Sequence, residues 1–273
     1  MRWLRRAALV LAALYAGVVL GMYLAQDRIM FDPDRSIVHP QELDLAGVEE
    51  VTIVTPDGES LAAWYTPAQS GHPTILFLHG KGGNIGHRPN RYRSYTAKGF
   101  GVLFLEWRGF GMSTGSPSEQ GLVTDAVAAY DWLLSRGLKP GAIAVVGESL
   151  GTGIAAILAT RRPVKVLALE AAYSSMADLA AYRYWWLPAR LLINNPIDAA
   201  AALTKVHIPL LMQHGTDDVT VPFVIGRRLF DFANQPKQFI AIPGAGHAIF
   251  TEPVFSREAA FILKSLGTQS VSQ

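Results

Sequence analysis

The amino-acid sequence predicts an α/β fold, in which helices cover both faces of a mostly parallel, eight-stranded sheet that follows one N-terminal transmembrane helix. Short apolar segments rich in β-branched residues alternate with segments of helical periodicity. Several of the short segments are apolar at every position, as in strands that are buried on both faces. The chain has 273 residues, half of them hydrophobic, which suits one domain with a large core.

The strands and helices are expected between residues 42 and 267, which we assign to the globular domain. Two strands flank the turn sequence Pro56-Asp57-Gly58 and should pair as an antiparallel hairpin. The eight predicted strands are Val51–Thr55, Leu61–Thr66, Ile75–His79, Val102–Glu106, Ile143–Gly147, Val164–Glu170, Pro209–His214 and Phe239–Pro243. The predicted helices are about Ser118–Ser135, Leu150–Arg161, Val221–Ala233 and Pro253–Leu266, and residues 268–273 form a tail.

Residues 1–26 differ in composition from the rest of the chain and are expected to anchor it in a membrane. Three arginines precede an uncharged run, Ala7–Ala25, whose 19 residues span roughly 28 Å as a helix. A cleaved signal sequence and a buried helix are the alternatives, although no good cleavage site is present. The arginines place the N-terminus in the cytoplasm and the domain on the periplasmic or other extracytoplasmic side, after a polar connector at 27–41.

Composition also excludes several kinds of site. The net charge is only +2, and no dense Lys/Arg stripe follows the N-terminus, so we expect no nucleic-acid partner. The absence of cysteine removes disulfides, thiolate metal sites and a cysteine nucleophile. The seven histidines lack the spacing of a metal motif, so we expect neither a metal nor another cofactor.

The pattern G-x-S-x-G, typical of a tight turn that presents a nucleophilic serine, occurs twice. One copy runs from Gly147 through Ser149 to Gly151, directly between a predicted strand and a predicted helix. The other centres on Ser113, seven residues beyond its strand, and continues into a proline that forbids an immediate helix. The strand–turn–helix context therefore selects Ser149, with the glycines allowing the close approach of strand and helix.

A serine nucleophile needs a base and a group that orients this base. His247 lies in a glycine-rich loop after the last predicted strand, and Asp217 and Asp218 follow the strand before it. Either aspartate suits the order Ser, Asp, His. Backbone N–H groups of Leu150 and Lys81 are the candidate oxyanion donors, because Leu150 follows the nucleophile and Lys81 lies in a glycine-rich turn after the third strand.

With these residues in place, the sequence resembles the serine aminopeptidase-type α/β-hydrolases, and most closely their Bem46-like branch, the ABHD13/ABHD17-like hydrolases. The resemblance covers about residues 51–266 and rests on the serine turn, the Asp and His loops, LFLHGKGGNIGHR at 76–88 and WRGFGMSTGSPS at 107–118. It implies an α/β-hydrolase fold and a structural role for the loop with Ser113. It also favours Asp218, three residues after Gly215, as the acid, although some hydrolases use the position of Glu170. Relatives usually carry Asn in place of Lys81.

Such hydrolases carry a small cap, here expected at about residues 173–205. Tyr173, Trp185 and Trp186 are candidate substrate-pocket residues, with core packing or contact with the bilayer as the alternatives for the tryptophans. We therefore expect a membrane-anchored serine hydrolase that cleaves a lipophilic acyl ester or thioester. A peptidase-like amidase and a catalytically silent, membrane-anchored binding protein are the other hypotheses.

Overall fold

The computed structural model describes residues 1–267, so the predicted tail at 268–273 lies outside the described residues. One eight-stranded sheet with the order β1-β2-β4-β3-β5-β6-β7-β8 forms the centre of the domain. Its strands run parallel from β4 to β8, whereas β2 is antiparallel to both of its neighbours. The strands are β1 Glu49–Val54, β2 Ser60–Thr66, β3 Thr74–Leu78, β4 Gly101–Leu105, β5 Ile143–Glu148, β6 Val166–Glu170, β7 Leu210–Gly215 and β8 Lys237–Ile242. The α/β fold and the β1–β2 hairpin are thus confirmed.

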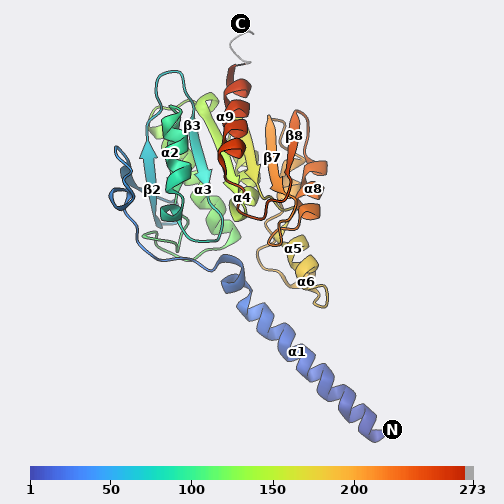
Figure 1. Cartoon of the computed structure of the whole chain (residues 1–273). Helices are drawn as coiled ribbons and strands as arrows, with labels where there is room; N and C mark the ends of the chain where they lie inside the picture. Colours follow the sequence, from blue (N-terminus) through green and yellow to red (C-terminus); the bar gives the residue numbers. More distant parts are fainter. Residues whose placement is uncertain (268–273) are drawn as a thin grey trace.

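Helices cover both faces of this sheet (Figure 1). Residues of α3, α4, α7 and α8 share one hydrophobic core, which includes Leu76 and Leu78 of β3. Residues of α2 and α9 share the other core, which includes Ile75 and Phe77 of the same strand. The described helices are α1 Arg2–Phe31, α2 Pro89–Ala97, α3 Glu119–Ser135, α4 Leu150–Arg161, α5 Met176–Arg183, α6 Ala189–Leu192, α7 Ala199–Leu203, α8 Phe223–Phe232 and α9 Glu252–Gly267.

Helix α1 projects from the domain as a long stem (Figure 1). Its 30 residues are about 45 Å long, and its apolar stretch has a mean hydropathy of 2.2 and is not buried by the rest of the chain. It is therefore long and apolar enough to cross a membrane. The helix continues five residues beyond residue 26 into the predicted connector, because Phe31 at its end is fully buried in the domain core.

Four short helices were not expected from the sequence. Helix α2 has mostly polar residues, and its two tyrosines, Tyr92 and Tyr95, fill the core instead of the aliphatic residues of a typical amphipathic pattern. Helices α5, α6 and α7 divide the crossover between β6 and β7 into segments of four to eight residues, too short to show a helical period.

Candidate active site

Ser149 lies in a sharp turn between strand β5 and helix α4. Its backbone adopts φ 49° and ψ −115°, a conformation that costs free energy for a residue with a side chain. A Cβ atom at Gly151 would lie 2.0 Å from the carbonyl oxygen of Leu78, and one at Gly147 would lie 2.8 Å from the backbone of α4. Both glycines are therefore needed for β3, β5 and α4 to meet around the serine.

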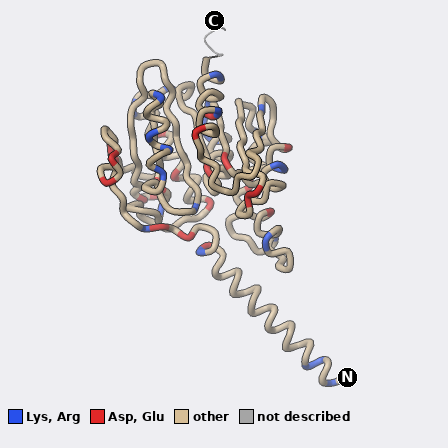
Figure 2. Tube along the Cα trace, in the orientation of Figure 1, with Lys and Arg blue, Asp and Glu red and all other residues tan. Residues whose placement is uncertain are grey.

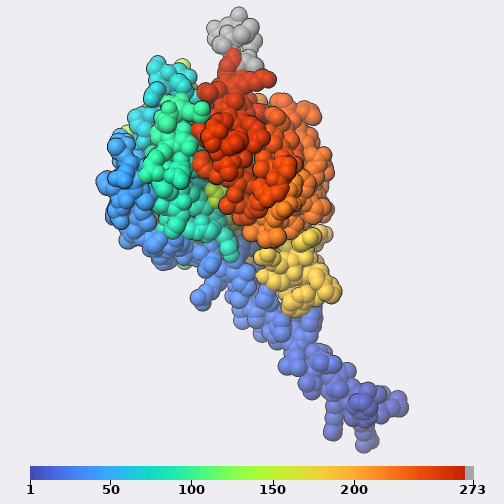
Figure 3. Space-filling model, in the orientation of Figure 1, coloured from blue at the N-terminus to red at the C-terminus, as the bar shows by residue number. Residues whose placement is uncertain are grey.

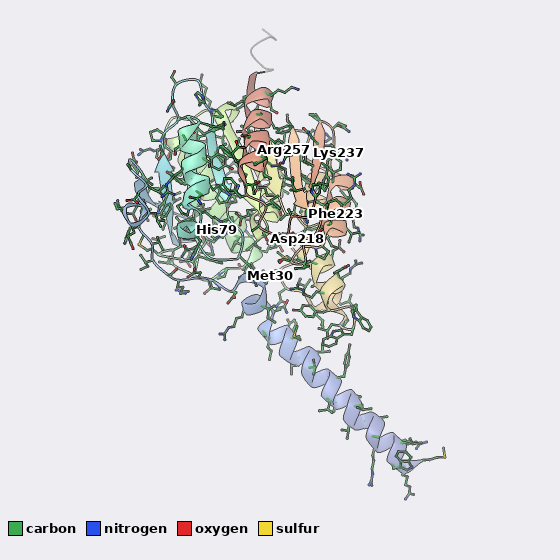
Figure 4. All side chains as sticks on the ribbon, viewed as in Figure 1. Met30, His79, Asp218, Phe223, Lys237 and Arg257 are labelled. Carbon is green, nitrogen blue, oxygen red and sulfur yellow. The ribbon has the colours of Figure 1, made fainter. Side chains whose placement is uncertain are left out.

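Three side chains form a continuous hydrogen-bonded series at this turn. His247 Nε2 is 2.9 Å from Ser149 Oγ, and His247 Nδ1 is 2.7 Å from Asp218 Oδ2. Asp218 and His247 come from the loops that follow β7 and β8, so the carboxyl ends of neighbouring parallel strands bring them to the serine. Figure 4 labels Asp218, which lies at the end of the sheet that faces α1.

Asp218 is buried and is surrounded by donors. Its Oδ1 accepts hydrogen bonds of 2.8 Å from the N–H groups of Thr220 and Val221, and His214 Nε2 lies 3.3 Å from Oδ2. Burial by itself would raise the pKa of Asp218, but the contacts with His214 and His247 outweigh burial and hold this pKa well below its ordinary value. Asp218 is thus a carboxylate that faces the imidazole throughout the neutral range.

The other two candidate acids face elsewhere. Asp217 is exposed and accepts a hydrogen bond of 2.9 Å from the hydroxyl of Thr216. Glu170 ends β6 and forms a buried ion pair with Arg91. The structure thus places Asp218, and neither Asp217 nor Glu170, beside His247.

Two backbone segments border Ser149 and are the candidate oxyanion donors. Leu150 begins α4, where the N–H groups of the first turn have no partner within the helix. A Cβ atom at Gly80 would lie 3.0 Å from Ser149 Cβ, so the backbone that leads into Lys81 passes directly beside the serine. Leu150 and Lys81 also line the same cavity as Ser149. Both backbone segments therefore lie close enough to Ser149 to be candidate donors.

The side chain of Lys81 reaches the stem. Its Nζ donates a 2.7 Å hydrogen bond to the carbonyl oxygen of Ile29, in the last turn of α1. A cation is favourable at a helix C-terminus, where the last carbonyls lack partners within the helix. Lys81 therefore joins the turn beside Ser149 to the N-terminal helix. The presence of Lys where relatives usually carry Asn did not predict this contact.

The second G-x-S-x-G sequence has a structural role. Ser113 is buried, accepts a hydrogen bond of 2.9 Å from Ala62 N–H and donates one of 3.0 Å to the carbonyl of Glu106. It therefore fixes the loop after β4 against strand β2. His79, labelled in Figure 4, is also buried, and its Nε2 lies 2.9 Å from a carboxylate oxygen of Glu106.

A cavity of about 690 Å³ opens beside Ser149. Tyr173 lines it and donates a 3.1 Å hydrogen bond to the carbonyl of Leu150. Trp185 and Trp186 do not line it; they lie on the surface of the predicted cap and are 82% and 42% exposed. Unexpectedly, the stem supplies part of the wall, through Val19, Met22, Tyr23, Gln26, Ile29 and Met30.

A buried charged cluster was not expected from the sequence, and three of its members, Arg91, Glu148 and Glu170, line the cavity. Arg91 of α2 contacts Glu170 and lies 3.7 Å from Glu148, while Tyr95 donates a hydrogen bond to Glu258 of α9. Burial and the neighbouring Glu170 raise the pKa of Glu258 to about 8. These residues are distant in sequence and belong to no common motif, so only the packing of α2 and α9 on the sheet brings them together. Within residues 1–267, no group of three metal-binding side chains converges.

Comparisons with known proteins agree with this architecture. A family model described as the alpha/beta hydrolase fold matches residues 73–208. The chain is 34% identical over 241 residues to the uncharacterized protein Rv2307c of Mycobacterium tuberculosis (strain ATCC 25618 / H37Rv), which covers 87% of this chain and 86% of that protein. Lysophosphatidylserine lipase ABHD12 of Danio rerio is 36% identical over 197 residues, or 64% of this chain and 51% of the lipase. The chain thus spans about half the length of that lipase.

Solved structures share the fold at low sequence identity. The Pyrococcus furiosus esterase Pf2001 superposes with a TM-score of 0.70 at 19% identity, covering 86% of this chain and 99% of the esterase. The esterase RhEst1 from Rhodococcus sp. ECU1013 gives a TM-score of 0.63 at 19% identity, covering 79% of this chain and 98% of the esterase.

Proposed function

Because the chain belongs to the α/β-hydrolase superfamily, we propose that it is a membrane-anchored serine hydrolase that cleaves a lipophilic acyl ester. The observation that carries this proposal is the hydrogen-bonded series Ser149–His247–Asp218 at the end of a large cavity. That the chain belongs to the Bem46-like branch of this superfamily remains a prediction.

The reaction would proceed through an acyl-enzyme. Ser149 Oγ attacks the ester carbonyl while His247 Nε2 takes its proton, and Asp218 holds the imidazole in the required tautomer. The N–H groups of Lys81 and Leu150 stabilise the negative charge on the carbonyl oxygen. His247 then protonates the leaving alcohol, and a water molecule activated by the same histidine releases the acid.

The composition of the cavity favours an acyl chain as the bound group. Apolar residues of α1, α5 and α6 form much of its wall, including Met22, Leu179 and Leu192. Its volume lies in the range of sites that enclose a small ligand. The names of similar proteins, a lysophosphatidylserine lipase and esterases, agree with an ester of a lipophilic acid.

The stem is proposed to act as the membrane anchor. Charged residues lie at its N-terminal tip and near the domain, whereas the length between them carries no charge (Figure 2). Arg2, Arg5 and Arg6 would remain in the cytoplasm by the positive-inside rule, which places the domain on the other side of the membrane.

A fluorophosphonate probe tests the nucleophile directly, since it reacts with activated serines. We expect wild-type protein to be labelled and Ser149→Ala to lose labelling, while Ser113→Ala, in the same five-residue pattern, keeps it. Absence of labelling in folded wild-type protein, or labelling that survives Ser149→Ala, would support a catalytically silent binding protein instead. Esters of increasing acyl length, assayed beside aminoacyl amides, would separate an esterase from an amidase.

A further inference from the structure

Residues 182–194 of the predicted cap, called the cap segment from here on, expose several large apolar side chains. Trp185 and Leu191 are 82% and 87% exposed, and Tyr182 and Trp186 are also largely accessible. Soluble proteins rarely expose contiguous groups of such residues, and aromatic side chains are enriched where a protein meets a lipid interface.

This cap segment lies along the stem. Tyr15 Oη donates a 2.9 Å hydrogen bond to the carbonyl of Trp186, and Gln26 Nε2 donates one of 3.2 Å to the carbonyl of Leu192. The backbone N–H of Asn194 in turn donates to Gln26 Oε1 over 2.7 Å. These contacts follow α1 over eleven residues, or about 16 Å. Figure 3 shows the yellow cap beside the blue stem, below the domain.

The contact at Tyr15 lies deep within the apolar part of α1. Tyr15 is ten residues before Ala25, the end of the uncharged run, which corresponds to about 15 Å along the helix or half of the hydrocarbon thickness of a bilayer. A hydroxyl at this depth needs a partner from the protein, and the Trp186 carbonyl supplies it. A cap that reaches Tyr15 must therefore share the membrane with a membrane-spanning α1.

The charges of the cap are compatible with this location, because they are directed back toward the domain. Arg190 forms a 2.7 Å ion pair with Asp178 of α5, and Arg183 donates to the carbonyl of Val219. Long arginine side chains commonly reach out of an apolar layer in this way. The charged residue next to the exposed Leu191 in the sequence is Arg190, and it is paired with Asp178.

We propose that the cap segment is inserted in the lipid leaflet on the side of the domain, and that a long-chain acyl ester reaches Ser149 laterally from this leaflet. The cavity is lined on one side by α1, at Val19 and Met22, and on the other by the cap, at Leu187 and Leu192. An acyl chain could thus pass between two elements that both contact lipid. This inference rests on the proposed function, because it needs α1 as an anchor and Ser149 as the nucleophile.

Spin-label accessibility tests the insertion, and the natural absence of cysteine makes single labels simple to place. The full chain in phosphatidylcholine vesicles would carry one nitroxide at Leu191→Cys, Val54→Cys or Leu14→Cys, all of which replace exposed apolar residues. We expect the labels at Leu191 and Leu14 to collide with oxygen but not with a water-soluble nickel chelate. The label at Val54, in β1 at the sheet edge, should show the opposite preference.

The three labels distinguish a failure of cap insertion from a failure of the membrane anchor. Chelate access at Leu191 equal to that at Val54, with Leu14 protected, would overturn the insertion of the cap while leaving the anchor intact. Chelate access at all three sites would overturn the anchor and the inference together. Neither result concerns the nucleophile, which fluorophosphonate labelling of Ser149 reports independently.

Lateral access is tested by the charge variant Leu191→Asp, with Val54→Asp as the matched control. We expect Leu191→Asp to lower kcat/KM at least fivefold for a long-chain ester embedded in vesicles, and to leave hydrolysis of dissolved p-nitrophenyl butyrate within twofold of wild type. Val54→Asp should change neither activity. An unchanged rate on vesicles, or an equal loss on both substrates, would overturn lateral access.

Discussion

At the scale of single residues, the hydrogen bonds of Asp218 distinguish it from the adjacent Asp217. Its Oδ1 is occupied by two backbone N–H groups, so Oδ2 is fixed toward His247. Asp217, one residue earlier, instead faces solvent. The choice of Asp218 as the proposed acid thus depends on how the loop after β7 folds around its carboxylate.

Asp218→Asn should lower kcat by on the order of 10⁴-fold, because a neutral amide no longer stabilises the imidazolium or selects the tautomer of His247. Asp217→Asn is the matched control and should stay within about twofold of wild type. Steady-state kinetics on a soluble ester, with folding verified by circular dichroism, would measure both. Similar losses in the two variants would contradict the assignment of Asp218.

The sequence was sufficient to predict Ser149, His247 and Leu150 as neighbours in the site, because each belongs to a local motif at the end of a strand. It left Asp217 and Asp218 unresolved until the family spacing was considered, since both follow the same strand. The contact of Lys81 with Ile29 could not be predicted. It depends on where the helix α1 ends relative to the sheet, which no local pattern specifies.

At the scale of elements, α2, β6 and α9 are joined by the buried cluster of Arg91, Glu170 and Glu258. Arg91 is the cation of this cluster and faces more than one carboxylate. Glu258 retains its proton at neutral pH because its pKa is raised to about 8. The packing of α9 on the sheet should therefore depend on pH. The sequence predicted α9 from its apolar period but gave no sign of this cluster.

Glu258→Gln tests this dependence, because the amide imitates the protonated acid. The folded protein binds a proton that the unfolded chain, with an ordinary pKa of 4.5, releases. The stabilisation from Glu258 is therefore complete below about pH 4.5 and is lost as the pH rises toward 8. The Tm of Glu258→Gln minus that of wild type should grow between pH 5 and 8, by several degrees.

The control for this measurement is Glu252→Gln, on the exposed first turn of the same helix α9. Its Tm relative to wild type should not follow the pH trend of Glu258→Gln. A difference between Glu258→Gln and wild type that stays constant from pH 5 to pH 8 would contradict the presence of a buried protonated carboxyl group.

The strands were predicted within about two residues at each end, because a fully apolar segment bounded by turns leaves little choice of where the strand begins and ends. The helix that packs through tyrosine and those of only one or two turns were missed. In α2 the side chains that reach the core are aromatic and lie among arginines, so no aliphatic period marks the buried face.

At the scale of the whole molecule, the stem combines two features. The sequence predicted the membrane anchor and the active site in separate segments of the chain. The stem is long enough to cross a membrane, and its last turns close one side of the active-site cavity. Cavity residues Val19, Met22, Gln26 and Met30 recur at helical spacing, so they share one face of α1. The opposite face, which includes Leu24 at 74% exposure, is the one that would face lipid under the proposed anchoring.

This division of α1 predicts that acyl-chain selectivity can be altered from within the anchor. Met22→Trp adds bulk to the cavity wall and should lower the ratio of kcat/KM for palmitoyl to that for butyryl p-nitrophenyl ester at least tenfold, measured in detergent micelles. Leu24→Trp adds the same bulk to the outer face and should preserve this ratio. If both variants shift the ratio equally, the effect arises from the apolar surroundings of the helix in the micelle, and α1 is no wall of the acyl site.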